Sequence, residues 1–351
     1  MFKAFTVYGL TTFVLMTPVI GSAEQTVQRF KTLADRRDAG IKHEITENLS
    51  LSPSLEFESE VINFNLQDVN SYRLRQRSKS AQLEIDVSAA EWFNAEAVYE
   101  YDDQLDRFIV DEALAEITLN DFKLESGKLY LPFGEFYSRF VSGPALEFAE
   151  TRGRAMVFSY EPSETLEAAV YVFKSKVGKK LPDENKTDWG AGINYSEEQQ
   201  FSVGVSYLSD LAETDEKLLE DTGFYNTQVG AVSAYANIIL GDYEVSFEFV
   251  QATGKFTELD ETSNQPMAWN IELGIYPGGD IDWALRIEGS KELEDQPEYQ
   301  LGINSTWHGS KHLSVSLDFL HGRFKHNFVE DESGNFISRQ SIVAAQLIFS
   351  F

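Results

Sequence analysis

The chain has 351 residues, with 29 Lys and Arg against 57 Asp and Glu, which gives a net charge of −28. This charge disfavours a nucleic-acid partner, because phosphates attract Lys and Arg. The chain has no cysteine, which excludes disulfides, thiol chemistry and a lipidated N-terminus, and its apolar content of 42% is too high for a disordered chain.

Residues 1–23 are typical of a secretory signal peptide. Lys3 is followed by an apolar run over residues 4–20 and by the small residues Gly-Ser-Ala at 21–23, which suit a cleavage site. A single anchoring helix is the alternative, but Pro18 and the polar sequence that follows disfavour it. No later stretch approaches the roughly 18 apolar residues that a transmembrane helix needs.

Residues 24–48 are expected to form a periplasmic tail ahead of a β-domain over residues 49–351. Within the tail, Val27, Phe30 and Leu33 have helical spacing, which favours a short helix. This helix is either a coil that helps the chain to form a trimer or a plain linker.

The remainder of the chain reads as strands of about ten residues that alternate between apolar and polar side chains. One clear example has Leu83, Ile85 and Val87 on one face and Gln82, Glu84 and Asp86 on the other. The pattern predicts sixteen strands, at 51–63, 80–90, 93–102, 111–120, 122–131, 154–161, 165–174, 188–196, 200–208, 228–240, 243–253, 267–276, 282–290, 298–307, 312–322 and 339–351.

Short turns and longer loops alternate between these strands. Turn residues such as Asn120-Asp121 and Gly241-Asp242 make the short connections, and segments such as 132–153 and 209–227 make the long ones. Strict alternation is expected when all short turns lie on one side of a membrane. We therefore predict an all-β fold, a transmembrane antiparallel β-barrel of sixteen strands with a short helical tail, over a secreted sandwich or propeller.

The segment 132–153 is a candidate functional loop, because loops longer than about 12–15 residues are usually functional. Its Phe and Leu side chains provide an apolar side that can pack on the inner wall of the barrel. Glu135, Arg139, Glu147 and Glu150 are then candidates to line a constriction, where charged side chains select solutes.

Arg152 and Arg154 present a question of orientation. They share the strand face of Met156, Phe158 and Tyr160, which is expected to meet lipid. Either a bulge at Gly153 turns them toward the lumen, or they lie at the membrane rim beside lipopolysaccharide phosphates. Both positions stay open, because Arg is costly at the bilayer midplane and tolerable near its surface.

The inward faces of the strands are predominantly acidic, which predicts a lumen that favours cations. Arg286 and Glu288 belong to this set as candidate solute-binding residues. The full predicted lumen set is Glu84, Asp86, Glu96, Glu112, Glu116, Glu244, Glu248, Glu272, Arg286, Glu288 and Asp318.

The stretch "GKLYLPFGEFYSRFVSGPALEFAETRGRA" resembles the signature of the LbtU family of siderophore porins. The matching positions are Gly127, Leu129, Tyr130, Pro132, Phe133, Gly134, Ser142, Pro144, Glu150, Thr151 and Arg152. Ala149 and Arg139 depart from the family pattern. The resemblance implies an outer-membrane barrel without a plug domain and the uptake of ferric siderophores.

Together these features predict an outer-membrane porin that passes small solutes passively through an acidic lumen narrowed by residues 132–153. The expected partners are the lipid bilayer, lipopolysaccharide and a small solute, for which the resemblance suggests a ferric siderophore, with a homotrimer as the expected assembly. We expect no enzyme activity, catalytic residue, metal or cofactor. The alternative is a surface receptor with a closed lumen.

Overall fold

The computed structural model describes residues 41–351 apart from 67–69, 78–80, 103–106, 143–144, 175–186, 198–199, 215–217, 219–227, 294–295, 327 and 330–334. The predicted signal peptide and most of the predicted tail lie outside the described residues, so both stay predictions. Within the described part of the chain, no helix is long and apolar enough to cross a membrane.

The described residues form eighteen strands and two short 3₁₀-helices. They are β1 (His43–Thr46), β2 (Leu49–Leu66), β3 (Asn70–Arg77), β4 (Ala81–Ala90), β5 (Phe93–Asp102), β6 (Arg107–Leu119), β7 (Phe122–Tyr130), η1 (Ala145–Ala149), β8 (Arg152–Ser163), β9 (Leu166–Lys174), β10 (Asp188–Glu197), β11 (Phe201–Leu208), η2 (Leu211–Glu213), β12 (Ala231–Leu240), β13 (Tyr243–Ala252), β14 (Met267–Ile275), β15 (Ile281–Lys291), β16 (Tyr299–Ser310), β17 (Leu313–Arg323) and β18 (Ile337–Ser350).

The strands form one closed antiparallel ring. From β4 onward each strand pairs with the next in sequence, and β18 pairs with β2 along nearly its whole length to close the barrel. The other edge of β2 pairs with β4 over residues 49–55 and with β3 over 58–65. Counting β3 and β4 as one interrupted strand and setting aside the short β1, the barrel has sixteen strands.

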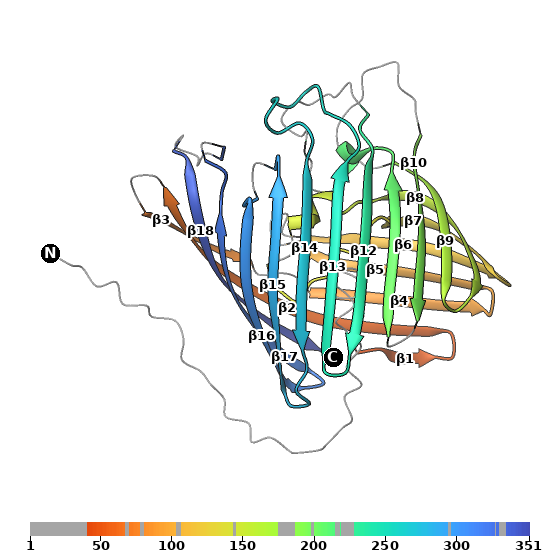
Figure 1. Cartoon of the computed structure of the whole chain (residues 1–351). Helices are drawn as coiled ribbons and strands as arrows, with labels where there is room; N and C mark the ends of the chain where they lie inside the picture. The colour runs from red at the N-terminus through yellow and green to blue at the C-terminus, as the bar shows by residue number, and fades with distance from the viewer. Residues whose placement is uncertain are drawn as a thin grey trace.

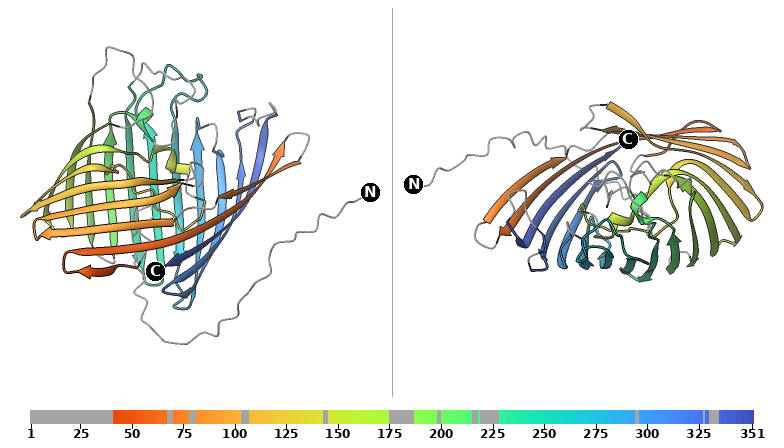
Figure 2. Two further views of the ribbon diagram at one scale, coloured as in Figure 1. Left: turned by 180° about the vertical axis from the view of Figure 1, so that it is seen from behind. Right: turned by 90° about the horizontal axis from the view of Figure 1, so that it is seen from above.

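Figure 1 shows the strands from β9 to β16 side by side in front, with β2 and β4–β8 crossing steeply behind them. Seen from above, the sheet curves around η1 and the chain that leads into it, which lie on its inner side (Figure 2). The segment predicted to fold inward therefore does so.

Each of the sixteen predicted strands is present, and the predicted all-β barrel is confirmed. One correction concerns residues 64–79, which were predicted to be a long loop. The chain instead continues β2 to Leu66 and returns as β3. The sequence of β3, NSYRLRQR, is so rich in charge that it resembles a solvated loop, yet pairing with β2 fixes it as a strand.

Many outward-facing side chains of the barrel are apolar and exposed, as hydrocarbon requires. Val170, Val205 and Leu317 are 56%, 55% and 54% exposed. A closed barrel can present such a surface to lipid because every strand finds its main-chain partners within the ring.

The inner side carries most of the polar groups, together with one large apolar cluster. Tyr171 and Phe173 of β9, Leu208 of β11 and Val250 of β13 all point inward and are buried in one cluster with side chains of the segment between β7 and β8. The inner wall therefore presents apolar side chains to this segment.

Candidate functional site

Residues 131–151, here called the inner loop, connect β7 to β8 and lie inside the barrel. The main-chain N–H of Leu131 donates to Thr151 O at 2.9 Å, which holds the two ends of the loop together. The side chains of Phe133, Phe140 and Leu146 are at most 1% exposed. The expected packing of the apolar side of this loop on the inner wall is therefore present.

The loop begins its inward path at Gly134, where the main chain passes very close to the wall. Gly134 has a φ of +74°, and a Cβ at this position would lie 2.6 Å from Oε1 of Glu248. A residue with a side chain would have both a strained main chain and a clash, so glycine is required here. Its N–H donates to Ser206 Oγ at 3.0 Å.

Inward carboxylates on successive strands hold the main chain of the inner loop. Glu248 on β13 accepts the N–H groups of Glu135 and Phe136 at 2.8 and 2.7 Å. Glu272 on β14 accepts the N–H of Arg139 at 2.9 Å and also the hydroxyl of Ser138.

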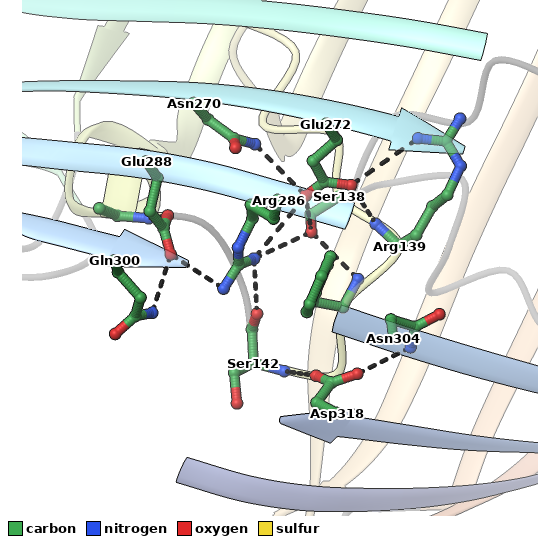
Figure 3. Close-up of polar contacts among 12 residues, drawn as sticks. Ser138, Arg139, Ser142, Asn270, Glu272, Arg286, Glu288, Gln300, Asn304 and Asp318 are labelled. Carbon is green, nitrogen blue, oxygen red and sulfur yellow. Dashed lines mark hydrogen bonds and ion pairs between the residues drawn. The ribbon is translucent and has the colours of Figure 1, made fainter. Parts of the chain in front are cut away.

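The same arrangement continues around the wall (Figure 3). Glu288 on β15 accepts the N–H of Ala145 at 2.7 Å, and Asp318 on β17 accepts the N–H of Ser142 at 3.0 Å. A loop without regular secondary structure must satisfy its buried N–H groups by other means. Here the barrel wall supplies the acceptors, and charged acceptors make the stronger hydrogen bonds.

Arg139, which was predicted to line an opening, is instead buried at the wall. Its Nη2 lies 2.6 Å from Oε2 of Glu244, and its Nε donates to the Tyr276 hydroxyl at 2.7 Å. Burial lowers the pKa of the Arg139 guanidinium, but the neighbouring tyrosines and carboxylates raise it, and the result is a pKa well above the ordinary value. Gly274 makes room for this side chain, because a Cβ there would lie 2.5 Å from Nε.

Arg286 and Glu288 also lie at the inner loop, where both are buried. Nη1 of Arg286 donates to Ser138 Oγ at 3.1 Å and to Ser142 O at 2.9 Å, while Nη2 lies 3.0 Å from Glu288. The guanidinium also stacks over the Phe140 ring at 4.3 Å. These two residues therefore fasten the loop, and their charges are shielded from the lumen.

The other predicted loop residues are half-buried. Glu135 accepts a hydrogen bond from Asn237 at 2.7 Å, and the main chains of Glu147 and Glu150 bond to each other at the end of η1. Their side chains remain candidates to line the opening.

The structure places Arg152 and Arg154 outside this site. The register of β8 pairs them with Tyr130 and Lys128, on the outward face of β7. Arg152 forms an ion pair with Asp111, which occupies a bulge in β6, and Arg154 is exposed. The strand keeps its alternation through Gly153, so these side chains lie at the outer rim.

Across the barrel, β4–β7 carry a second group of inward carboxylates, here called the acidic wall: Glu84, Asp86, Glu96, Glu112, Glu116 and Glu125. All six are half-buried, and the strand registers place them on the inward face. One inward cation lies among them, because Nζ of Lys123 is 3.6 Å from Oε2 of Glu125. Oxygens of Glu84, Asp86 and Glu96 lie within 4.8 Å of one another. This crowding of like charges makes the region strongly attractive to cations.

Sequence reasoning missed the anchoring role of Ser138, Ser142 and Asp318 and the apolar inward face of β9. One available signal was the sequence LEAAVYVFK, in which alternation between apolar and polar residues breaks down. A strand that is apolar on both faces must be covered on both faces, here by lipid outside and by the inner loop within.

The ring, its lipid-facing surface and its inward loop define a porin-like, outer-membrane type of β-barrel. No family model matches the chain, and no curated protein matches it. Solved structures do match. The outer membrane channel DcaP of Acinetobacter baumannii is 11% identical with a TM-score of 0.60, covering 88% of this chain and 99% of DcaP.

An anion-selective porin from Comamonas acidovorans is also 11% identical, with a TM-score of 0.63, covering 86% of this chain and 99% of its own. OmpT of Vibrio cholerae, described as a trimer form, is 10% identical with a TM-score of 0.53, covering 86% and 99%. At these identities the likeness establishes the fold.

Proposed function

We propose that the protein is a passive outer-membrane channel for small solutes that prefers cations. The observation that carries this proposal is the unequal use of the inward carboxylates. Those on β13–β17 bind the main chain of the inner loop, whereas those of the acidic wall are half-buried, and Asp86, Glu116 and Glu125 bond to side chains of β2, β5 and β7, respectively. The charge that a permeating ion meets is therefore that of the acidic wall.

The selectivity of such a channel is set by the charged side chains that line it, so a shared fold does not carry a shared preference. The Comamonas porin of similar fold is described as anion-selective. Carboxylates lining a narrow passage attract cations and repel anions. The acidic wall accordingly favours a cationic or neutral solute.

The test is the reversal potential of single channels in a planar bilayer under a salt gradient. We expect the wild-type potential to indicate cation preference and the triple variant Glu84→Gln, Glu96→Gln, Glu116→Gln to shift it toward zero. The matched control changes three exposed acids of the short turns, Glu91→Gln, Glu164→Gln and Asp280→Asn. Equal reversal potentials for the two triple variants would show that the acidic wall does not determine the ion selectivity.

Location and assembly form part of the same proposal. The predicted signal peptide and the apolar outer surface support insertion in the outer membrane, with lipopolysaccharide on the side of the long loops. A homotrimer is the assembly that we propose, supported by the described trimer form of OmpT.

A receptor with a closed lumen is the second candidate, and one observation favours it. The apolar cluster of the inner loop also takes in Leu211, Phe256 and Leu293 from segments at the long-loop side of the barrel, so that this side is partly covered. Discrete conductance steps would support the channel. Silent membranes combined with tight solute binding would support the receptor.

The uptake of ferric siderophores is the narrower proposal that the sequence resemblance implies. The acidic wall suits a neutral or cationic complex better than a strongly anionic one. Deletion of the gene should impair growth on a ferric siderophore under iron limitation, and normal growth would contradict this narrower role without affecting the channel proposal.

A further inference from the structure

The cations on the outward face of the barrel are confined to one end of it. In the described strands β4–β18, outward-facing cations lie within three residues of the strand ends that lead into the long loops. They are Lys128, Arg152, Arg154, Lys174, Lys291, Arg323 and Arg339. In a chain with a net charge of −28, such a collar of positive charge is unexpected.

The densest part of the collar lies across three neighbouring strands. Lys128 on β7 is in register with Arg154 on β8, which is in register with Lys174 on β9. We call these three residues the outer basic cluster. They surround a shallow hollow in the outer surface, which Met156 and Val172 also line.

One cation of the cluster is held in place by the protein, and the other two are exposed to a ligand. Nζ of Lys128 donates to the main-chain oxygen of Val110 at 2.6 Å, which fixes the ammonium group in place. Arg154 and Lys174 are exposed, and neither forms an ion pair with any residue that the structure describes. Their donors can therefore bind an external anion.

The surroundings indicate the depth of this cluster in a membrane. The next outward positions toward the short turns on β8 and β9, Met156 and Val172, are 51% and 46% exposed and apolar, and Ser126 of β7 lies beside Met156. Trp189, which is in register with Val172, is 51% exposed. Tryptophan is typical of the boundary between hydrocarbon and headgroups. Cations directly beyond such a boundary lie at the height of lipid phosphates.

We propose that the outer basic cluster binds a phosphate group of lipopolysaccharide in the outer leaflet. The guanidinium of Arg154 can make a bidentate contact with a phosphate, and the two flanking ammonium groups add point charges. The acyl chains would lie on Met156 and Val172. This inference rests on the proposed outer-membrane location and is independent of conduction.

A second copy of the chain is a poorer occupant. A copy that docked through β15, β17 or β18 would present Lys291, Arg323 or Arg339 at the same height, which are cations as well. Like charges facing each other are destabilising, whereas a phosphate is complementary.

The test uses the full mature chain in detergent and bisphosphorylated lipid A as the probe, with bound lipid counted by native mass spectrometry. We expect the double variant Arg154→Gln, Lys174→Gln to lose about thirtyfold in affinity, since a cation near a charged lipid surface contributes roughly a fivefold factor. The matched control, Lys291→Gln with Lys311→Gln, removes the same charge at two positions outside the outer basic cluster, one of them already paired with Glu292, and should bind like wild type.

The outcomes separate the possible explanations. Equal affinity of the double variant and the control, or equal binding of dephosphorylated lipid A, would overturn the proposal. Unchanged lipid affinity with a change in the number of chains per particle would identify the cluster as an interface between copies. The single variant Arg154→Gln serves if the double variant fails to fold. Unaltered single-channel conductance in these variants is expected, because the cluster lies outside the lumen.

Discussion

The substitution Glu272→Ala tests whether wall carboxylates hold the inner loop. Glu272 is completely buried and accepts hydrogen bonds from Ser138 and from the N–H of Arg139. Its oxygens also lie 3.7 Å from the guanidinium groups of Arg139 and Arg286. The substitution would remove these contacts together and would leave two buried cations with less compensation.

Removal of one partner from a buried ionic network costs about 3–5 kcal/mol. The contacts that are lost join the loop to the wall, so the substitution lowers the free energy needed to release the loop by a similar amount. A change of about 4 kcal/mol raises the population of released loop about a thousandfold. This figure applies when release and rebinding of the loop are faster than the reaction that detects release.

Limited trypsin digestion followed by peptide mapping provides the assay. The side chain of Arg139 is only 9% exposed, so cleavage after Arg139 requires release of the loop. We expect this cleavage to become at least a hundredfold faster in Glu272→Ala, with Glu272→Gln in between and Glu116→Ala, on the acidic wall, unchanged. An unchanged cleavage rate in a correctly folded Glu272→Ala barrel would refute the anchoring role.

Three further substitutions probe the same contact. Gly274→Ala would place a methyl group 2.5 Å from Nε of Arg139, so the loop should loosen and open-channel current noise should rise. The Phe140 side chain is 1% exposed and its ring packs on Arg286, so Phe140→Ala leaves a cavity. This cavity should lower the free energy of unfolding of the barrel in urea by about 3–5 kcal/mol. Tyr276→Phe removes the hydroxyl between Arg139 and Glu244 and should cost about 1–3 kcal/mol, seen as a moderate increase in cleavage after Arg139. Unchanged current noise would contradict the expectation for Gly274→Ala, and an unchanged unfolding midpoint that for Phe140→Ala. Unchanged cleavage after Arg139 would contradict the expectation for Tyr276→Phe.

The strands and the inward direction of residues 132–153 were predictable because both depend on local sequence pattern. Alternation with a period of two decides which side chains meet lipid, and a register shift by one residue would expose every polar side chain to hydrocarbon. The sequence also indicated part of the cation-rich rim, because Arg152 and Arg154 share a strand face with Met156 and Phe158. The charged strand β3 was missed because its composition is that of a loop.

The sequence by itself therefore determined the barrel, its number of strands, its two faces and the presence of one unusual inward segment. Only the tertiary structure decided which of many similar carboxylates hold that segment and which stay in the lumen. Glu116 and Glu272 have the same local pattern, an acid on the inward face of an apolar strand. Their roles differ because Glu272 accepts the main-chain N–H of Arg139 in the inner loop, whereas Glu116 accepts hydrogen bonds from Asn94 and Thr118 in β5 and β6. Contacts between positions more than a hundred residues apart, such as that of Arg139 with Glu272, leave no trace in local periodicity.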